Sequence, residues 1–166
     1  MPRMNRAFRE GLILGFIAYL SVAAFYAVFD LLAARGTLYT VNLLGKAVFG
    51  GPADAAALQQ PIALDMQAMF WYDALHLVVS LAVGVVVIAL VAQAERRSSA
   101  APLAFVTIVG GYVATIVTVG LLSEPIRQVL PWWTIIVANS SAVVLGGAYV
   151  LRSHPGAWRT LTTFAR

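Results

Sequence analysis

The sequence has 166 residues, of which 61% are hydrophobic and only 11% are charged, and its mean hydropathy is +0.85. Soluble domains carry roughly 25% charged residues, so this composition excludes an ordinary soluble enzyme or binding domain and indicates a polytopic membrane protein. The absence of cysteine excludes disulfides, thiolate metal sites and thiol catalysis. The net charge of +4 does not indicate nucleic-acid binding, because most of the basic residues lie on one side of the predicted membrane spans and so reflect topology.

Four long runs without charge predict an all-α fold, an integral membrane bundle of four transmembrane helices that forms one domain over residues 1–166. A helix needs about 20 residues to cross a hydrocarbon core of ~30 Å, and each run meets that length. The predicted spans are residues 11–31, 73–94, 101–123 and 131–151.

The first span follows three arginines, as the apolar part of a signal peptide does, but it is longer and no clear cleavage site follows it. We therefore expect a retained anchor. Gly11 and Gly15 form a small face of the GxxxG type that lets another helix approach closely. Farther along, Tyr19, Tyr26 and Asp30 share a face. They line a quinone or ion path, or they form an interfacial tyrosine belt above an aspartate, and the second interpretation needs fewer assumptions.

Residues 37–70 form the outer connection, which is too long for a structureless loop in so small a protein. Within it an apolar face recurs at helical spacing, while the polar residues Asn42 and Lys46 point away from that face. The face consists of Leu38, Val41, Leu44 and Val48. This pattern predicts an interfacial helix that lies on the outer membrane surface and ends at Gly50-Gly51-Pro52. We expect this connection to dock a partner.

The second span carries the most deeply placed ionisable residues. Asp73, His76, Ser80 and Gly84 fall at i, i+3, i+7 and i+11, so they form one stripe on an otherwise apolar helix. Such a stripe must face protein or water rather than lipid. We expect a structural pair in which Asp73 accepts a hydrogen bond from His76 while the outer end of the third span approaches.

The last two spans carry packing faces and interfacial anchors. Gly111 lies on a small, hydrogen-bonding face of the third span, and Glu124 beyond that span is expected to pair with Arg127 at i+3. The fourth span begins with an aromatic anchor and carries a polar-to-small face inside the membrane. These residues are Trp132, Trp133, Asn139 and Gly146.

Basic residues are distributed unequally about the spans. Eight of the eleven lysines and arginines lie on the side of the two termini, and three, Arg35, Lys46 and Arg127, lie on the other side. The positive-inside rule therefore predicts a multi-pass membrane protein with both termini cytoplasmic. Residues 152–166 then form an inner interfacial tail. The expected partners are membrane lipids and other integral membrane subunits, not nucleic acid.

Cofactor chemistry would depend on His76. The other histidine, His154, is predicted about 30 Å away on the opposite side, so haem would need a homodimer or another axial ligand. Copper would draw on Met69, Asp73 and His76 together with Met66, but the helix between Met66 and His76 spans ~15 Å and the two cannot share one ion. We expect neither a cofactor nor a metal, and an electron-transfer protein that binds haem or copper through His76 stays as the alternative.

Enzymatic and transport functions find less support. Asp73, His76 and Ser80 include an acid, a base and a nucleophile, but they follow one helix and no second element supplies an oxyanion hole. We therefore expect no enzymatic activity. A small transporter needs a carboxylate near the middle of the membrane, whereas the acids lie toward the span ends, and this function stays as a further alternative.

Several segments together resemble a group of small, uncharacterised four-helix bacterial inner-membrane proteins. The segments are Thr40-Val-Asn-Leu-Leu-Gly-Lys-Ala-Val-Phe-Gly-Gly51, Tyr72-Asp-Ala-Leu-His-Leu with Gly84 and Glu95, Leu130-Pro-Trp-Trp with Asn139, and Arg152-Ser-His-Pro155. The resemblance implies a four-helix membrane protein, and it transfers no catalytic residue because the group has no assigned activity. Small-residue faces on all four spans predict a non-catalytic accessory or structural subunit that packs against a larger membrane complex of the respiratory or photosynthetic type.

Overall fold

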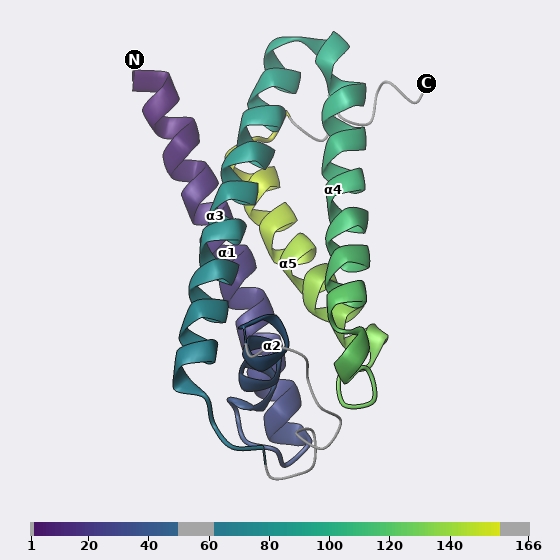
Figure 1. Ribbon diagram of the computed structural model, residues 1–166. Coiled ribbons are helices and arrows are strands. Elements are labelled where there is room, and N and C mark those ends of the chain that lie inside the picture. The colour runs from purple at the N-terminus through teal and green to yellow at the C-terminus, as the bar shows by residue number, and fades with distance from the viewer. Residues whose placement is uncertain (1, 50–61, 157–166) are drawn as a thin grey trace.

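The computed structural model describes residues 2–49 and 62–156, and within these ranges the fold is all-α (Figure 1). The helices are α1 (Pro2–Leu32), α2 (Tyr39–Phe49), α3 (Met66–Arg96), α4 (Ala101–Leu122) and α5 (Trp132–Ser153), with short 3₁₀ turns η2 (Ser98–Ala100) and η3 (Glu124–Ile126). Of these, α1, α3, α4 and α5 are long and apolar enough to cross a membrane, which confirms the predicted set of four spans. The chain thus has the helices of a multi-pass membrane protein.

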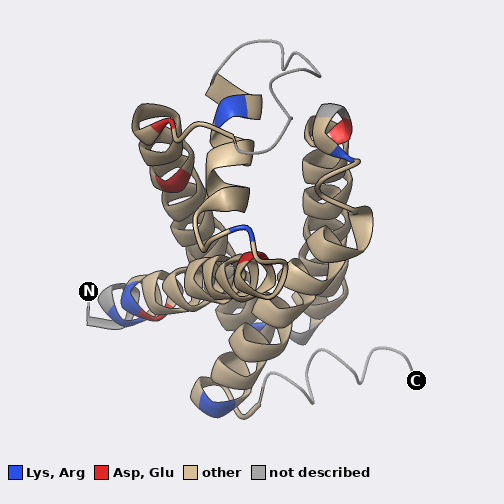
Figure 2. Cartoon of the chain, turned by 90° about the horizontal axis from the view of Figure 1, so that it is seen from below, with Lys and Arg blue, Asp and Glu red and all other residues tan. Residues whose placement is uncertain are grey.

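The two ends of the bundle differ in composition. The first residues of α1 and the last residues of α3 and α5 lie at one end, which we call the terminal end; α2 lies at the opposite end, the α2 end (Figure 1). Charged residues gather near the helix ends, and α4 carries none along its length (Figure 2). This distribution is the one that a hydrocarbon core requires.

Helix α3 begins at Met66, before the predicted membrane span 73–94. Asp65 precedes it in an extended conformation and caps it, because its Oδ1 accepts a hydrogen bond of 3.0 Å from the backbone N–H of Ala68. The predicted terminator Gly50-Gly51-Pro52 and residues 157–166 of the predicted tail lie outside the described residues. Helix α2 ends at Phe49, directly before that terminator.

Glycines bring α1 and α3 into backbone contact. A Cβ atom added at Gly84 would lie 2.3 Å from the carbonyl oxygen of Gly11 and 2.4 Å from the nitrogen of Gly15. A Cβ at Gly15 would in turn lie 2.5 Å from the Cα of Leu81. No side chain fits at these positions, so the small faces predicted on the first two spans pack against each other.

Helix α5 packs against α1, so α1, α3 and α5 form one unit that is joined through α1. Gly146 of α5 faces Leu14 of α1, and a Cβ added at Gly146 would lie 2.8 Å from a methyl group of Leu14. Ile88 of α3 and Ile135 and Ala138 of α5 are fully buried. Close contact through small residues thus holds both neighbours of α1 in place.

Helix α4 stands apart from this unit along most of its length (Figures 1 and 2). At the terminal end it contacts α3 through a small cluster of Ala94, Ala101 and Ala104. At the α2 end Gly120 faces the ring of Trp132, and a Cβ atom added at Gly120 would lie 2.4 Å from that ring. Between these points the phenol of Tyr112 and the hydroxyl of Ser140 form a hydrogen bond of 2.7 Å.

Helix α2 packs against the bundle through a face that differs from the predicted one. Tyr39, Leu43 and Leu44 are buried together with Ile126 and Leu130, while two residues of the predicted apolar face, Leu38 and Val48, are exposed. Asn42, which the sequence placed away from the packing face, is 1% exposed. Its amide donates to the carbonyl of Ala63 at 3.2 Å and its oxygen accepts from the N–H of Asp65 at 2.9 Å, so it ties α2 to the segment that leads into α3.

Candidate functional site

The carboxylate of Asp73 lies between α3 and α1, where its partner is a tyrosine. The hydroxyl of Tyr19 lies 2.9 Å from each of the two carboxylate oxygens and donates to them. From the sequence, the expected donor was His76 and the expected neighbouring element was the outer end of the third span. Sequence spacing along one helix could not reveal Tyr19, because it comes from another helix 54 residues away.

His76 lies among aromatic rings. Its ring centroid is 5.2 Å from that of Tyr19 and 6.3 Å from that of Tyr72, and Tyr19 also stacks on Phe16 at 6.1 Å. Burial among such rings suits a histidine that packs as well as one that binds, so the contacts alone assign no ligand. Among the described residues, no group of three or more His, Cys, Asp or Glu side chains is arranged to hold a metal ion.

Asp30 is a fully buried acid that joins α1 to α2. One carboxylate oxygen accepts from the backbone N–H of Thr40 and the other from its hydroxyl, both at 2.6 Å. The carboxylate thus caps the first turn of α2 from a different helix, where the helix dipole also favours a negative charge. Arg35 lies over the rings of Phe29 and Tyr39 at 5.0 and 4.9 Å and donates to the carbonyl of Val129.

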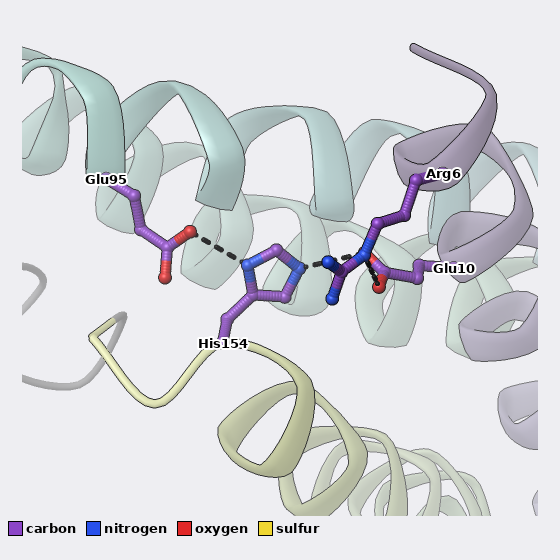
Figure 3. A network of polar contacts seen from close by, with 4 residues as sticks. All are labelled: Arg6, Glu10, Glu95 and His154. Atoms are coloured by element: carbon purple, nitrogen blue, oxygen red, sulfur yellow. Dashed lines mark hydrogen bonds and ion pairs between the residues drawn. The ribbon is translucent and has the colours of Figure 1, made fainter. Parts of the chain in front are cut away.

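A second polar network lies at the terminal end and joins three helices (Figure 3). The imidazole of His154, just after α5, has Nδ1 at 2.8 Å from Oε2 of Glu95 on α3 and Nε2 at 3.2 Å from Oε2 of Glu10 on α1. Arg6 donates from Nε to Oε1 of Glu10 at 2.9 Å. The His154 and Glu10 side chains are only 12% and 10% exposed, so their contact is largely shielded from solvent, whereas Glu95 is 29% and Arg6 68% exposed.

The sequence contains a signal for this network, but spacing along one helix does not reveal it. Glu10 and Glu95 are the two acids on the side that carries eight basic residues, and both lie near helix ends, as His154 does. The arrangement of the helices brings these ends together at one side of the bundle. His154, predicted on the side opposite His76, directly follows α5 at the terminal end.

The remaining predicted residues serve packing and capping. Glu124 and Arg127 approach to 3.8 Å as expected, and Arg127 also lies over the ring of Trp132 at 5.5 Å. Trp133 is half exposed and meets Phe29 edge-on at 5.6 Å. Asn139 donates to the carbonyl of Ile135 in its own helix at 2.8 Å, and the backbone of Ser80 contacts Gly15. Of the two methionines, Met69 is buried and Met66 is exposed.

The small-residue face of α4 has no counterpart within the described chain. Cβ atoms added at Gly110 or Gly111 would meet no atom within 4 Å. Thr107, Ala114 and Thr118 share this face and are exposed. The partly or fully buried residues of α4 lie on a different side of the helix. These are Ala101, Ala104, Ile108, Tyr112, Ile116, Val119 and Gly120.

No protein-family model, curated protein or solved structure matches this chain.

Proposed function

We propose that this protein is a non-catalytic accessory subunit of a larger bacterial inner-membrane complex of the respiratory or photosynthetic type, with both termini in the cytoplasm. The observation that carries the proposal is the exposed small-residue face of α4. The partner is another integral membrane subunit, and one of its helices packs on this face. The orientation rests on the unequal distribution of basic residues about the spans, and the location in the bacterial inner membrane rests on the resemblance described above.

Most of the other helical glycines that the structure describes pack within the chain, and the exception is Gly147 of α5, which also has nothing within 4 Å of an added Cβ. Gly11 and Gly15 meet Gly84, Gly146 meets Leu14, and Gly120 meets Trp132. Gly110 and Gly111 lie in the middle of α4 and meet nothing. A glycine in a helix interior costs about 1 kcal/mol relative to alanine, and a close helix–helix contact is the usual compensation in membranes. A partner helix would supply that contact.

The polar clusters support a structural role. Asp73 is bonded by Tyr19 and Asp30 by Thr40, and each of these pairs joins two helices. Intramembrane acids that are held in this way stabilise a bundle without a substrate.

One observation favours the second candidate, a small proton-coupled transporter. Tyr19 is the middle residue of the candidate membrane span of α1, Arg6–Leu32, and its hydroxyl donates a hydrogen bond to the Asp73 carboxylate at that depth. A carboxylate at this depth is a feature of proton-coupled transporters. Uptake or efflux that depends on Asp73 would support this function over the accessory role.

Co-purification tests the accessory role. The chain, tagged and expressed at its natural level, should migrate with a larger complex on native gels after extraction in mild detergent. Gly111→Leu should weaken this association at least tenfold without lowering the stability of the isolated chain, because nothing lies within 4 Å of a Cβ there and leucine is the better helix former. Val106→Leu, at an exposed position beside the small face, is the matched control and should have no effect. A chain that migrates alone, or a complex that tolerates Gly111→Leu, would contradict the proposal.

A further inference from the structure

We infer that the terminal-end network is a proton-operated clamp, in which protonation of His154 fastens the end of α5 to α1 and α3. The two flanking groups, Glu10 and Glu95, come from those two helices, and both are carboxylates facing opposite nitrogens of one ring. This inference is independent of the proposed function.

The geometry selects the doubly protonated ring. An ionised carboxylate only accepts hydrogen bonds, and a neutral imidazole has one N–H and one lone pair. With neutral His154, one of the two contacts would set that lone pair against a carboxylate oxygen. The imidazolium has an N–H for each carboxylate, so both contacts, at 2.8 and 3.2 Å, become charge-assisted hydrogen bonds.

Charge balance in the network agrees with this protonation state. Arg6 and a charged His154 carry two positive charges against the two negative charges of Glu10 and Glu95, so the cluster is neutral. Loss of one proton would leave a net negative charge where Glu10 and His154 are largely buried, which is unfavourable. The clamp is therefore closed when the imidazole is charged and loosens as rising pH removes its proton.

Among the side chains that the structure describes, His154 has no other charged partner. Helix α1 faces it with Glu10 and, behind that residue, Arg6; α3 faces it with Glu95; and α4 has no charged residue. On α5, Tyr149 lies near Arg6. The other basic side chains described at this end are exposed, and these are Arg9, Arg96, Arg97 and Arg152.

Spin-label distances test the clamp directly in the full chain. The sequence has no cysteine, so paired cysteines at the exposed positions Phe8 on α1 and Leu151 on α5 give a clean label pair in nanodiscs of neutral lipid. As the pH is raised stepwise from acidic to alkaline, the wild type should pass from one narrow distance to a broader, longer distribution. A pair at Val28 and Val137, nearer the α2 end, should not change.

Three variants separate the clamp from general stability. His154→Gln cannot titrate and should abolish the pH dependence, whereas His154→Arg keeps a permanent charge and should stay closed throughout. Glu95→Gln places an amide donor opposite Nδ1, which suits the neutral ring, so this variant should stay closed at high pH. An unchanged distance in the wild type across the range, or a pH dependence that persists in His154→Gln, would overturn the inference.

Discussion

Tyr19 is the residue on which the position of Asp73 depends. Its hydroxyl serves both carboxylate oxygens at 2.9 Å, and the pair joins α1 to α3 beyond their glycine contact. A hydrogen bond to a charged group in a shielded site stabilises by about 1.5 to 3 kcal/mol, and loss of one partner leaves the other uncompensated.

Tyr19→Phe should therefore lower the free energy of unfolding by about 1.5 to 3 kcal/mol, as measured by denaturation in detergent. Combining it with Asp73→Asn should cost less than the sum of the single changes, because the uncompensated charge is then absent. Stability equal to the wild type in Tyr19→Phe would show that the carboxylate is solvated instead.

For His76, the contacts predict a modest effect of substitution. Because Tyr19 holds Asp73, both His76→Gln and His76→Leu should fold, and each should change stability by about 1 kcal/mol or less. Thermal melts of the purified variants measure this. If both variants fold normally but abolish a measured activity, His76 binds a ligand or carries a proton.

At the scale of the elements, the sequence predicted the four spans well because each is a long apolar run bounded by charges. The packing face of α2 could not be predicted in the same way. Spacing identifies apolar residues, but here Asn42 turns inward to bond the chain before α3, and Thr40 turns inward to meet Asp30. The terminal network was equally hidden, since His154 lies 144 residues from Glu10.

The attachment of α2 by Asp30 can be broken selectively. Asp30→Ala leaves the buried N–H and hydroxyl of Thr40 without their acceptor, so α2 should detach more often and become sensitive to protease between residues 37 and 49 in membranes. Thr40→Val keeps the backbone hydrogen bond and should be cleaved at an intermediate rate. Equal resistance of all three proteins would show that apolar packing alone holds α2.

For the whole molecule, the start of α1 and the end of α5 lie at the terminal end of the bundle, and the eight-to-three distribution of basic residues predicts that this end faces the cytoplasm. A reporter enzyme that is active only in the cytoplasm should therefore be active when fused after Arg166. The same reporter inserted in the 50–61 connection should be inactive, and the opposite pattern would reverse the orientation.

Two sets of helical glycines should differ in the substitutions that they tolerate, depending on whether folding of the chain or assembly of the complex is selected. In a library scored for folding of the isolated chain, Gly11, Gly15 and Gly84 should reject every larger residue, because the opposing atoms are backbone and cannot move aside. Gly110 and Gly111 should accept many residues in that screen. In cells whose growth requires the complex, Gly110 and Gly111 should tolerate as few larger residues as Gly11, Gly15 and Gly84 do. Positions of α4 that tolerate substitution in the folding screen but not in the assembly screen would identify the residues that contact the partner.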